Sequence, residues 1–124
     1  LLVMSYNPGY QSALKDLKHS TRQRFVAIEF QPPPPEIESQ IVEHEAGVDG
    51  KTAMQLAKLG AKVCNLREHG LAEGASTRLL IYAGKLIAQG IEPRRACQVA
   101  VNWAVTDDVS IHTSIAEVIS SIFE

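Results

Sequence analysis

Residues 25–35 have the sequence FVAIEFQPPPP, in which a run of β-branched and aromatic residues is followed directly by four prolines. The apolar run is typical of a β-strand that packs on a core. Four consecutive prolines can continue neither a helix nor a sheet, and they favour a stiff polyproline spacer. The sequence therefore predicts that the chain divides here, with a strand over 25–30 and a separate part after the prolines.

The chain before this stretch begins with LLVMSY, a second apolar run that predicts a short buried strand over residues 1–6. The turn signal Asn7-Pro8-Gly9 follows and leaves Asn7 at the end of that strand. Open α/β sheets bind ligands beyond the carboxyl ends of their strands. Asn7 is therefore a candidate binding residue, and an ordinary turn asparagine explains the pattern equally well.

The chain after the prolines has the spacing of four or five amphipathic helices, which predicts a helical bundle. The expected caps and ends are Gly47 after the first helix, Asp49 before the second, Ser76 or Thr77 before the third, Pro93 in the first turn of the fourth, and Asp107 or Asp108 before the last. The predicted buried positions are, helix by helix, Ile37, Ile41 and Val42; Met54, Ala57, Leu59 and Val63; Leu79, Tyr82, Ala83, Leu86 and Ile87; and Ile111, Ile115, Val118, Ile119 and Ile122.

The composition limits the class of protein. The chain has 124 residues, of which 45% are hydrophobic, and its formal net charge is −2. This length suits one ordinary domain, and the composition excludes collagen-like, coiled-coil and disordered chains. The balanced charge offers no basic face for nucleic acid, and no apolar stretch approaches the roughly 18 residues that span a bilayer. Cys64 and Cys97 are too few for a disulfide framework, so we expect buried thiols and a cytoplasmic protein.

Residues 47–52, GVDGKT, share their last letters with a phosphate-binding loop, but the rest of that motif is absent. The motif requires a glycine five positions before Gly50, where this chain has Glu45, and it follows a strand rather than a helix. Histidines stand at positions 19, 44, 69 and 112 without the spacing of metal ligands. We therefore expect neither a metal site nor a nucleophile motif in this chain.

Two short segments place arginines where a plain helical domain does not require them. Residues 20–24, STRQR, stand directly before the second predicted strand, and guanidinium groups are suited to bidentate phosphate contacts. Arg22 and Arg24 are therefore candidate phosphate ligands, with surface solubility as the alternative. Residues 74–78, GASTR, open the most regular helix, and Arg78 lies in its first turn, where a cation opposes the helix dipole. Such a local violation suggests a functional demand.

Three segments together resemble one family. They are SYNPGYQ at 5–11, STRQRF at 20–25, and the segment that runs from Gly70-Leu71 to GASTRLL at 74–80. They resemble the MoxR-type AAA+ ATPases, and among these the CbbQ/NirQ/NorQ subgroup with its specific C-terminal domain. The resemblance covers essentially the whole chain. It implies a mainly α fold with a small β remnant: the last two strands of an AAA+ α/β core in residues 1–31, a Pro-rich linker at 32–36, and an α-helical lid at 37–124.

The resemblance also implies roles for the four polar candidates. Asn7 matches the first sensor, which positions the attacking water. Arg24 matches the arginine finger, which reaches the nucleotide of the neighbouring subunit, and Arg22 is a second candidate for that role. Arg78 matches the second sensor, which contacts phosphate of the subunit's own nucleotide. The implied cofactors are ATP and Mg²⁺, bound mainly by residues outside this chain.

The function that the resemblance implies is that of a hexameric, chaperone-like motor. Family members couple ATP hydrolysis to remodelling of an enzyme complex, together with a partner that bears a von Willebrand factor type A domain. The associated targets are inhibited Rubisco and nitric oxide reductase, and no residue of this chain discriminates between them. The chain lacks a phosphate-binding loop and an acidic Walker B strand, so we do not expect it to hydrolyse ATP alone. The alternatives are a stand-alone helical interaction module without catalysis and a nucleic-acid binder built on residues 15–24; we expect neither nucleic-acid binding nor membrane insertion.

Overall fold

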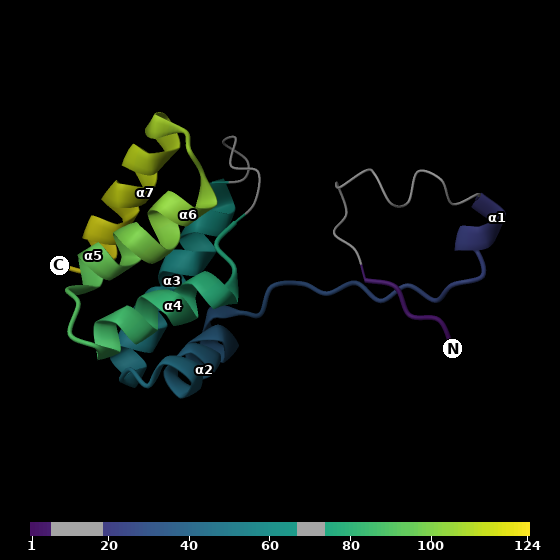
Figure 1. Cartoon of the computed structure of the whole chain (residues 1–124), viewed down its shortest axis with the longest axis horizontal. Helices are drawn as coiled ribbons and strands as arrows, with labels where there is room; N and C mark the ends of the chain where they lie inside the picture. Colours follow the sequence, from purple (N-terminus) through teal and green to yellow (C-terminus); the bar gives the residue numbers. More distant parts are fainter. Residues whose placement is uncertain (6–18, 67–73) are drawn as a thin grey trace. The chain divides into compact units, whose positions relative to one another are not determined.

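Residues 1–5, 19–66 and 74–124 are described by the structure, a computed structural model of the whole chain. They belong to two compact units, Leu1–Pro32 and Pro33–Glu124 (Figure 1). In the described residues of the first unit the regular structure consists of α1, His19–Arg22. The second unit contains the remaining helices and the hydrophobic core.

The two predicted strands are not found. The described residues, 1–5 and 19–66 and 74–124, contain no strand, and residues 1–5 and 25–30 have no regular structure. A strand is held by the ladder of hydrogen bonds to a neighbouring strand, and the described residues give neither segment such a partner. Without that partner their apolar side chains, among them Val26, Ile28 and Phe30, are exposed. The small β remnant of the predicted fold is therefore not shown, whereas the mainly α character is.

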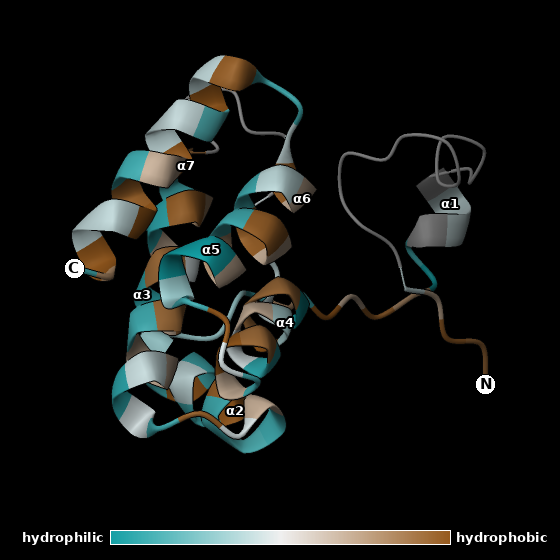
Figure 2. Ribbon diagram, turned by 60° about the vertical axis from the view of Figure 1, so that its left-hand side comes forward, coloured by the Kyte–Doolittle hydropathy of each residue, from teal (hydrophilic) through white to brown (hydrophobic). Residues whose placement is uncertain are grey.

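The second unit is a bundle of helices whose bounds are set by recognisable signals. In chain order it contains α2 Pro35–Ala46, α3 Gly50–Asn65, α4 Thr77–Ala88, α5 Pro93–Cys97, the π-helical turn η2 Gln98–Asn102, α6 Trp103–Val105 and α7 Val109–Ile122. Helix α2 packs on α3 and α4, and α3 also packs on α7. Apolar and polar residues alternate along the longer ribbons, as brown and teal bands show in Figure 2. This alternation is the amphipathic pattern from which the bundle was predicted.

The predicted caps are largely confirmed. Gly47 ends α2 with a positive φ of 70°, a conformation that glycine adopts without strain. The Asp49 carboxylate accepts the Thr52 N–H at 2.9 Å and so caps α3. Pro93 stands at the first position of α5, where its missing N–H costs no hydrogen bond. Of the two aspartates before α7, Asp108 is the cap.

The polyproline segment leads directly into α2. Pro34 has φ −63° and ψ 154°, which are polyproline values, and it serves as the N-cap of α2. Helix α2 begins at Pro35, two residues before the predicted start at residue 37. The earlier start is possible because proline at the first helical position sacrifices no intrahelical hydrogen bond.

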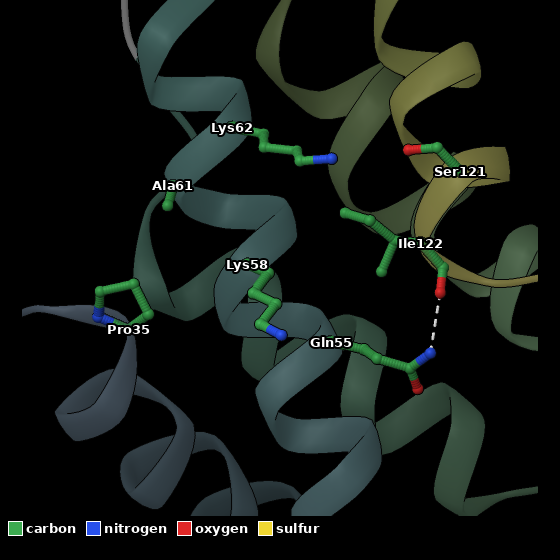
Figure 3. A pocket seen from close by; sticks show the side chains of 7 residues that line it. All are labelled: Pro35, Gln55, Lys58, Ala61, Lys62, Ser121 and Ile122. Carbon is green, nitrogen blue, oxygen red and sulfur yellow. Dashed lines mark hydrogen bonds between the residues drawn. The ribbon is translucent and has the colours of Figure 1, made fainter.

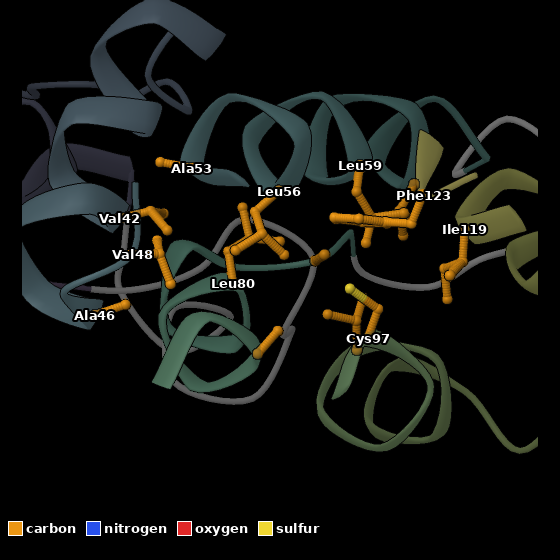
Figure 4. Close-up of a cluster of buried hydrophobic side chains, with 14 of the residues drawn as sticks. Val42, Ala46, Val48, Ala53, Leu56, Leu59, Leu80, Cys97, Ile119 and Phe123 are labelled. Carbon is orange, nitrogen blue, oxygen red and sulfur yellow. The ribbon is translucent and has the colours of Figure 1, made fainter. Parts of the chain in front are cut away.

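The core of the second unit draws on every longer helix. It includes Val42 from α2, Leu56 from α3, Leu80 from α4, Cys97 from α5 and Ile119 from α7, all at most 2% exposed (Figure 4). The fully buried thiol of Cys97 has its pKa raised to about 12 by burial and, secondarily, by the charge of Glu92, so it stays protonated. Cys97 is therefore one of the two buried thiols that were predicted, whereas Cys64 is only partly buried.

The buried faces of two helices differ from the predicted ones. In α2, Ile37 and Ile41 are exposed, while Glu38, Ser39, Val42 and Ala46 are buried. In α4 the predicted Ala83 is buried and the predicted Leu79 and Ile87 pack against the core, but Tyr82 is 50% exposed, and Leu80 and Gly84 are buried instead. The α7 prediction is confirmed, since Ile115 and Ile119 are buried and its other predicted residues pack against the core.

Close contact between helices explains the α4 register. A Cβ on Gly84 would lie 2.6 Å from the Cβ of Ala46 in α2, and one on Gly60 of α3 would lie 2.7 Å from Cδ1 of Leu80. Because Gly84 and Gly60 have no side chains, α4 can pack closely against both α2 and α3. The face of α4 that makes these contacts contains Leu80 and Gly84. Helical periodicity counts only apolar side chains and takes no account of the close packing that a glycine permits. It therefore predicted that Tyr82 would be buried.

A polar contact joins the last helix to the π turn. The buried Asn102 donates from Nδ2 to the carbonyl oxygen of His112 in α7 at 3.0 Å.

Within the residues that the structure describes, no helix combines the length and apolar composition needed to cross a bilayer.

Candidate functional site

The first group of predicted site residues lies in the unit Leu1–Pro32. Asn7, the candidate first sensor, lies outside the described residues. Arg22 is the last residue of α1. Arg24 is exposed, and its backbone N–H donates to the carbonyl oxygen of Thr21 at 3.1 Å, which closes the turn after α1. The structure thus presents Arg24 to solvent just after a short helix.

Arg78 lies in the other unit, as the second residue of α4, and it is exposed. The first turn of α4, all of it described, contains no acidic residue that would offset the unfavourable position of a cation there. Ser76 stands at the N-cap position but makes no side-chain capping bond to this turn. Arg78 therefore stands exposed in the first turn of a helix whose N-cap residue makes no side-chain capping bond.

The start of α4 is instead held by a residue from α2. The Thr77 hydroxyl donates to Oε1 of Glu38 at 2.7 Å. Glu38 is only 7% exposed, and burial raises the pKa of its carboxyl, while the hydrogen bond from Thr77 lowers it in part. This contact links two residues that are 39 positions apart in the sequence, directly beside Arg78.

The apolar spacing does not predict Glu38 as a site residue, because it assigns the buried face of this helix to the neighbouring Ile37. A usable signal was present: Glu38, Val42 and Ala46 are spaced four residues apart, so they share one helix face, and Val42 was predicted to be buried. Charged side chains are rarely buried unless they are paired. The apolar spacing therefore predicted that Ile37, and not Glu38, would be buried.

A second feature is a groove between α3 and the C-terminal end of α7 (Figure 3). Its volume is about 470 Å³. The lining residues are Pro35, Gln55, Lys58, Ala61, Lys62, Ser121 and Ile122. Gln55 donates from Nε2 to the carbonyl oxygen of Ile122 at 2.8 Å and so closes one end. The two lysines, four residues apart on α3, make the groove positively charged.

In residues 1–5, 19–66 and 74–124, no group of three or more His, Cys, Asp or Glu side chains is placed to hold a metal ion. At the surface of the α5–α6 stretch, the Arg95 guanidinium lies over the half-exposed ring of Trp103, 5.1 Å from its centroid.

Comparison with known proteins places this geometry in a family. The family model described as CbbQ/NirQ/NorQ C-terminal matches residues 38–122. The chain belongs to the CbbQ/NirQ/NorQ family. The matched range begins at Glu38 and lies within the helical unit Pro33–Glu124. It therefore includes Arg78 and Thr77, whereas Arg24 lies before it.

Individual relatives extend the similarity over nearly the whole chain. Protein CbbQ of Hydrogenophilus thermoluteolus is 51% identical over 98% of this chain, and the denitrification regulatory protein NirQ of Stutzerimonas stutzeri is 46% identical over 96% of it. Protein NorQ of Paracoccus denitrificans is 44% identical over 99%. The match covers 46%, 43% and 46% of these relatives, so the chain spans less than half of their length.

Proposed function

We propose that this chain is the C-terminal part of an ATP-hydrolysing, chaperone-like AAA+ motor of the MoxR type, which activates a metabolic enzyme complex. The observation that carries this proposal is the family match over residues 38–122, together with relatives 44–51% identical over nearly all of the chain. In this proposal, residues 1–31 complete the ATPase core, residues 32–36 link it to the lid, and residues 37–124 form the lid.

The proposed roles of the polar residues follow from their type and exposure. Arg24 acts as the arginine finger on the nucleotide of the next subunit, with Arg22 as the second candidate, and Arg78 contacts the phosphates of its own subunit's nucleotide. The exposure of Arg24 and Arg78 supports these roles, because a phosphate contact needs an accessible guanidinium. Asn7 is proposed to position the attacking water. ATP and Mg²⁺ are proposed to bind mainly to residues outside this chain.

The proposed assembly is a cytoplasmic hexamer that works with a partner bearing a von Willebrand factor type A domain. Its target is proposed to be Rubisco or nitric oxide reductase. One relative is named a denitrification regulatory protein, which supports the second target, while the 51% identity to protein CbbQ supports the first. We place Rubisco first because that identity exceeds the 44–46% of the relatives named NirQ and NorQ.

The decisive test replaces Arg24 in a full-length protein that carries this chain. Arg24→Ala is expected to lower ATP hydrolysis by about 10³-fold or more, because arginine fingers contribute on that scale elsewhere, and to leave nucleotide binding intact. The matched control is Gln23→Ala, at the exposed position beside it, which is expected to keep full activity. ATPase assays and nucleotide-binding titrations measure the two effects separately.

Mixing experiments test whether Arg24 acts across a subunit interface. A Walker B mutant keeps its own finger but lacks hydrolysis, so adding it to Arg24→Ala subunits is expected to restore part of the turnover. Absence of any rescue would refute action across the interface. If Arg24→Ala, Arg22→Ala and Arg78→Ala all left hydrolysis unchanged, the chain would instead be a helical interaction module.

A further inference from the structure

The start of α4 is held by a hydrogen bond to another helix. Its N-cap residue Ser76 contributes no side-chain capping bond to the described first turn, and the hydroxyl of Thr77 bonds to Glu38 of α2 instead. Thr77 is the residue directly before Arg78. Any displacement of Thr77 therefore moves the backbone from which the Arg78 side chain extends.

The acceptor of this hydrogen bond is a buried carboxyl group. Glu38 is 7% exposed, and its Oε2 lies beside Gly60 of α3, where a Cβ would be 3.4 Å from that oxygen. Burying a carboxyl is costly compared with burying an apolar side chain of similar size. A residue that stays in such a position suggests a role other than stability.

The position of Glu38 in α2 shows which parts of the helical unit this hydrogen bond connects. Glu38 is the fourth residue of α2, which starts at Pro35 directly after the polyproline segment. The contact at 2.7 Å therefore joins the first turn of the helical unit to the start of the helix that carries Arg78. In this way α2 and α4 hold one another at the point where the arginine emerges.

We propose that Glu38 and Thr77 are positioning residues for Arg78: their hydrogen bond sets the N-terminus of α4 so that the guanidinium is held ready for the nucleotide phosphates. This inference rests on the proposed function of Arg78 as a phosphate ligand. It assigns a role to two residues that touch no nucleotide themselves and act through the arginine.

The first test is Thr77→Val in a full-length protein, which removes the hydroxyl and keeps the side-chain shape. Hydrogen bonds to a carboxylate are among the stronger ones in proteins, and a tenfold change in affinity corresponds to about 1.4 kcal/mol. We therefore expect the KM for ATP to rise about tenfold. Thr77→Ser, which returns a hydroxyl, is expected to recover most of that loss. Ser76→Ala is the matched control, since its hydroxyl makes no capping bond, and it is expected to keep the KM within about twofold.

The second test separates positioning from stability. Glu38→Met replaces the buried carboxyl with an apolar side chain of similar length, so we expect a folded protein whose Tm is equal or higher. Its KM for ATP is nevertheless expected to rise about tenfold. Glu38→Gln keeps an acceptor oxygen for Thr77 and is expected to recover most of the affinity. A purely structural residue would not raise the KM while the Tm holds.

A double-mutant cycle decides whether the effect passes through Arg78. In an Arg78→Ala background, Thr77→Val is expected to have no further effect on the KM. If Arg78→Ala raises the KM but Thr77→Val and Glu38→Met do not, or if their effects simply add to that of Arg78→Ala, the positioning role is wrong and the proposed function stands. If Arg78→Ala itself leaves the KM unchanged, the phosphate role of Arg78 fails and this inference fails with it.

Discussion

At the scale of the residue, small and charged side chains decide how the helical unit packs. Glu38 takes a buried place beside Val42 where the apolar pattern pointed to Ile37. Gly84 is buried in α4 with no side chain of its own, and a Cβ there would lie 2.6 Å from that of Ala46. The contact is between two atoms fixed to backbone, so neither can move aside without shifting a helix.

Gly84→Ala is therefore expected to destabilise the chain by about 1–3 kcal/mol, the usual cost of overpacking a core. This outcome opposes the helix propensity of alanine, which alone would stabilise α4 by up to roughly 1 kcal/mol. Gly50→Ala in α3 is the control, because its Cβ would meet only the Glu43 carboxylate at 3.5 Å or more. Urea unfolding of the three proteins measures the difference, and an equal or higher stability of Gly84→Ala would contradict the close packing.

At the scale of the element, helix ends were easier to predict than helix faces. A cap depends on one residue and its immediate neighbours, and Gly47, Asp49 and Pro93 perform the predicted tasks. A buried face depends on what lies across from it. The α7 face was predicted because its isoleucines repeat at helical spacing. The α4 face was predicted except at Tyr82, which is exposed, because apolar residues surround that helix and only its neighbours select among them.

The aspartates before α7 offer a matched pair for testing one cap. The Asp108 carboxylate accepts the backbone N–H groups of Ser110 at 2.8 Å and Ile111 at 3.2 Å. We expect Asp108→Ala to lower the Tm of the chain, because it leaves those donors without a capping acceptor. Asp107→Ala is expected to leave the Tm close to that of the unaltered chain.

The same pair predicts a pH dependence. Hydrogen bonds from Ser110 and Ile111 lower the pKa of Asp108 from 3.8. A lowered folded-state pKa means that the stabilisation is present above the unfolded value and is lost as the pH falls through the folded one. The Tm difference between the two variants should therefore hold at neutral pH and shrink below about pH 3.8. A difference that persists undiminished in acid would contradict capping by the ionised carboxylate.

At the scale of the whole molecule, the chain consists of two unlike units. Every residue of the hydrophobic core cluster lies between Val42 and Phe123, within the unit Pro33–Glu124. The described residues of the other unit have α1 as their regular element, and several of their apolar side chains are exposed. The polyproline stretch that predicted a division of the chain stands at the boundary between the two units.

Removing residues 1–31 is accordingly expected to leave the thermal transition of the helical unit within a few degrees of its original Tm. The control truncation removes residues 109–124, which include the buried Ile115, Ile119 and Phe123, and it is expected to abolish cooperative melting. Circular dichroism melting curves of the three chains make the comparison. Loss of the transition after removal of residues 1–31 would show that the helical unit depends on that segment.

The amino-acid sequence by itself determined the helical part, its caps, the division at the prolines and the family, because each rests on local spacing or on motifs of a few residues. It also singled out Arg24 and Arg78 as arginines that packing does not require. Tertiary structure alone decided which side of α2 and α4 is buried, and it brought Glu38 to Thr77 across 39 residues. Those outcomes depend on the space that distant residues such as Gly60 leave free, and no local pattern contains that information. The two predicted strands are not shown by the described residues for a related reason, since a strand exists only where another strand pairs with it.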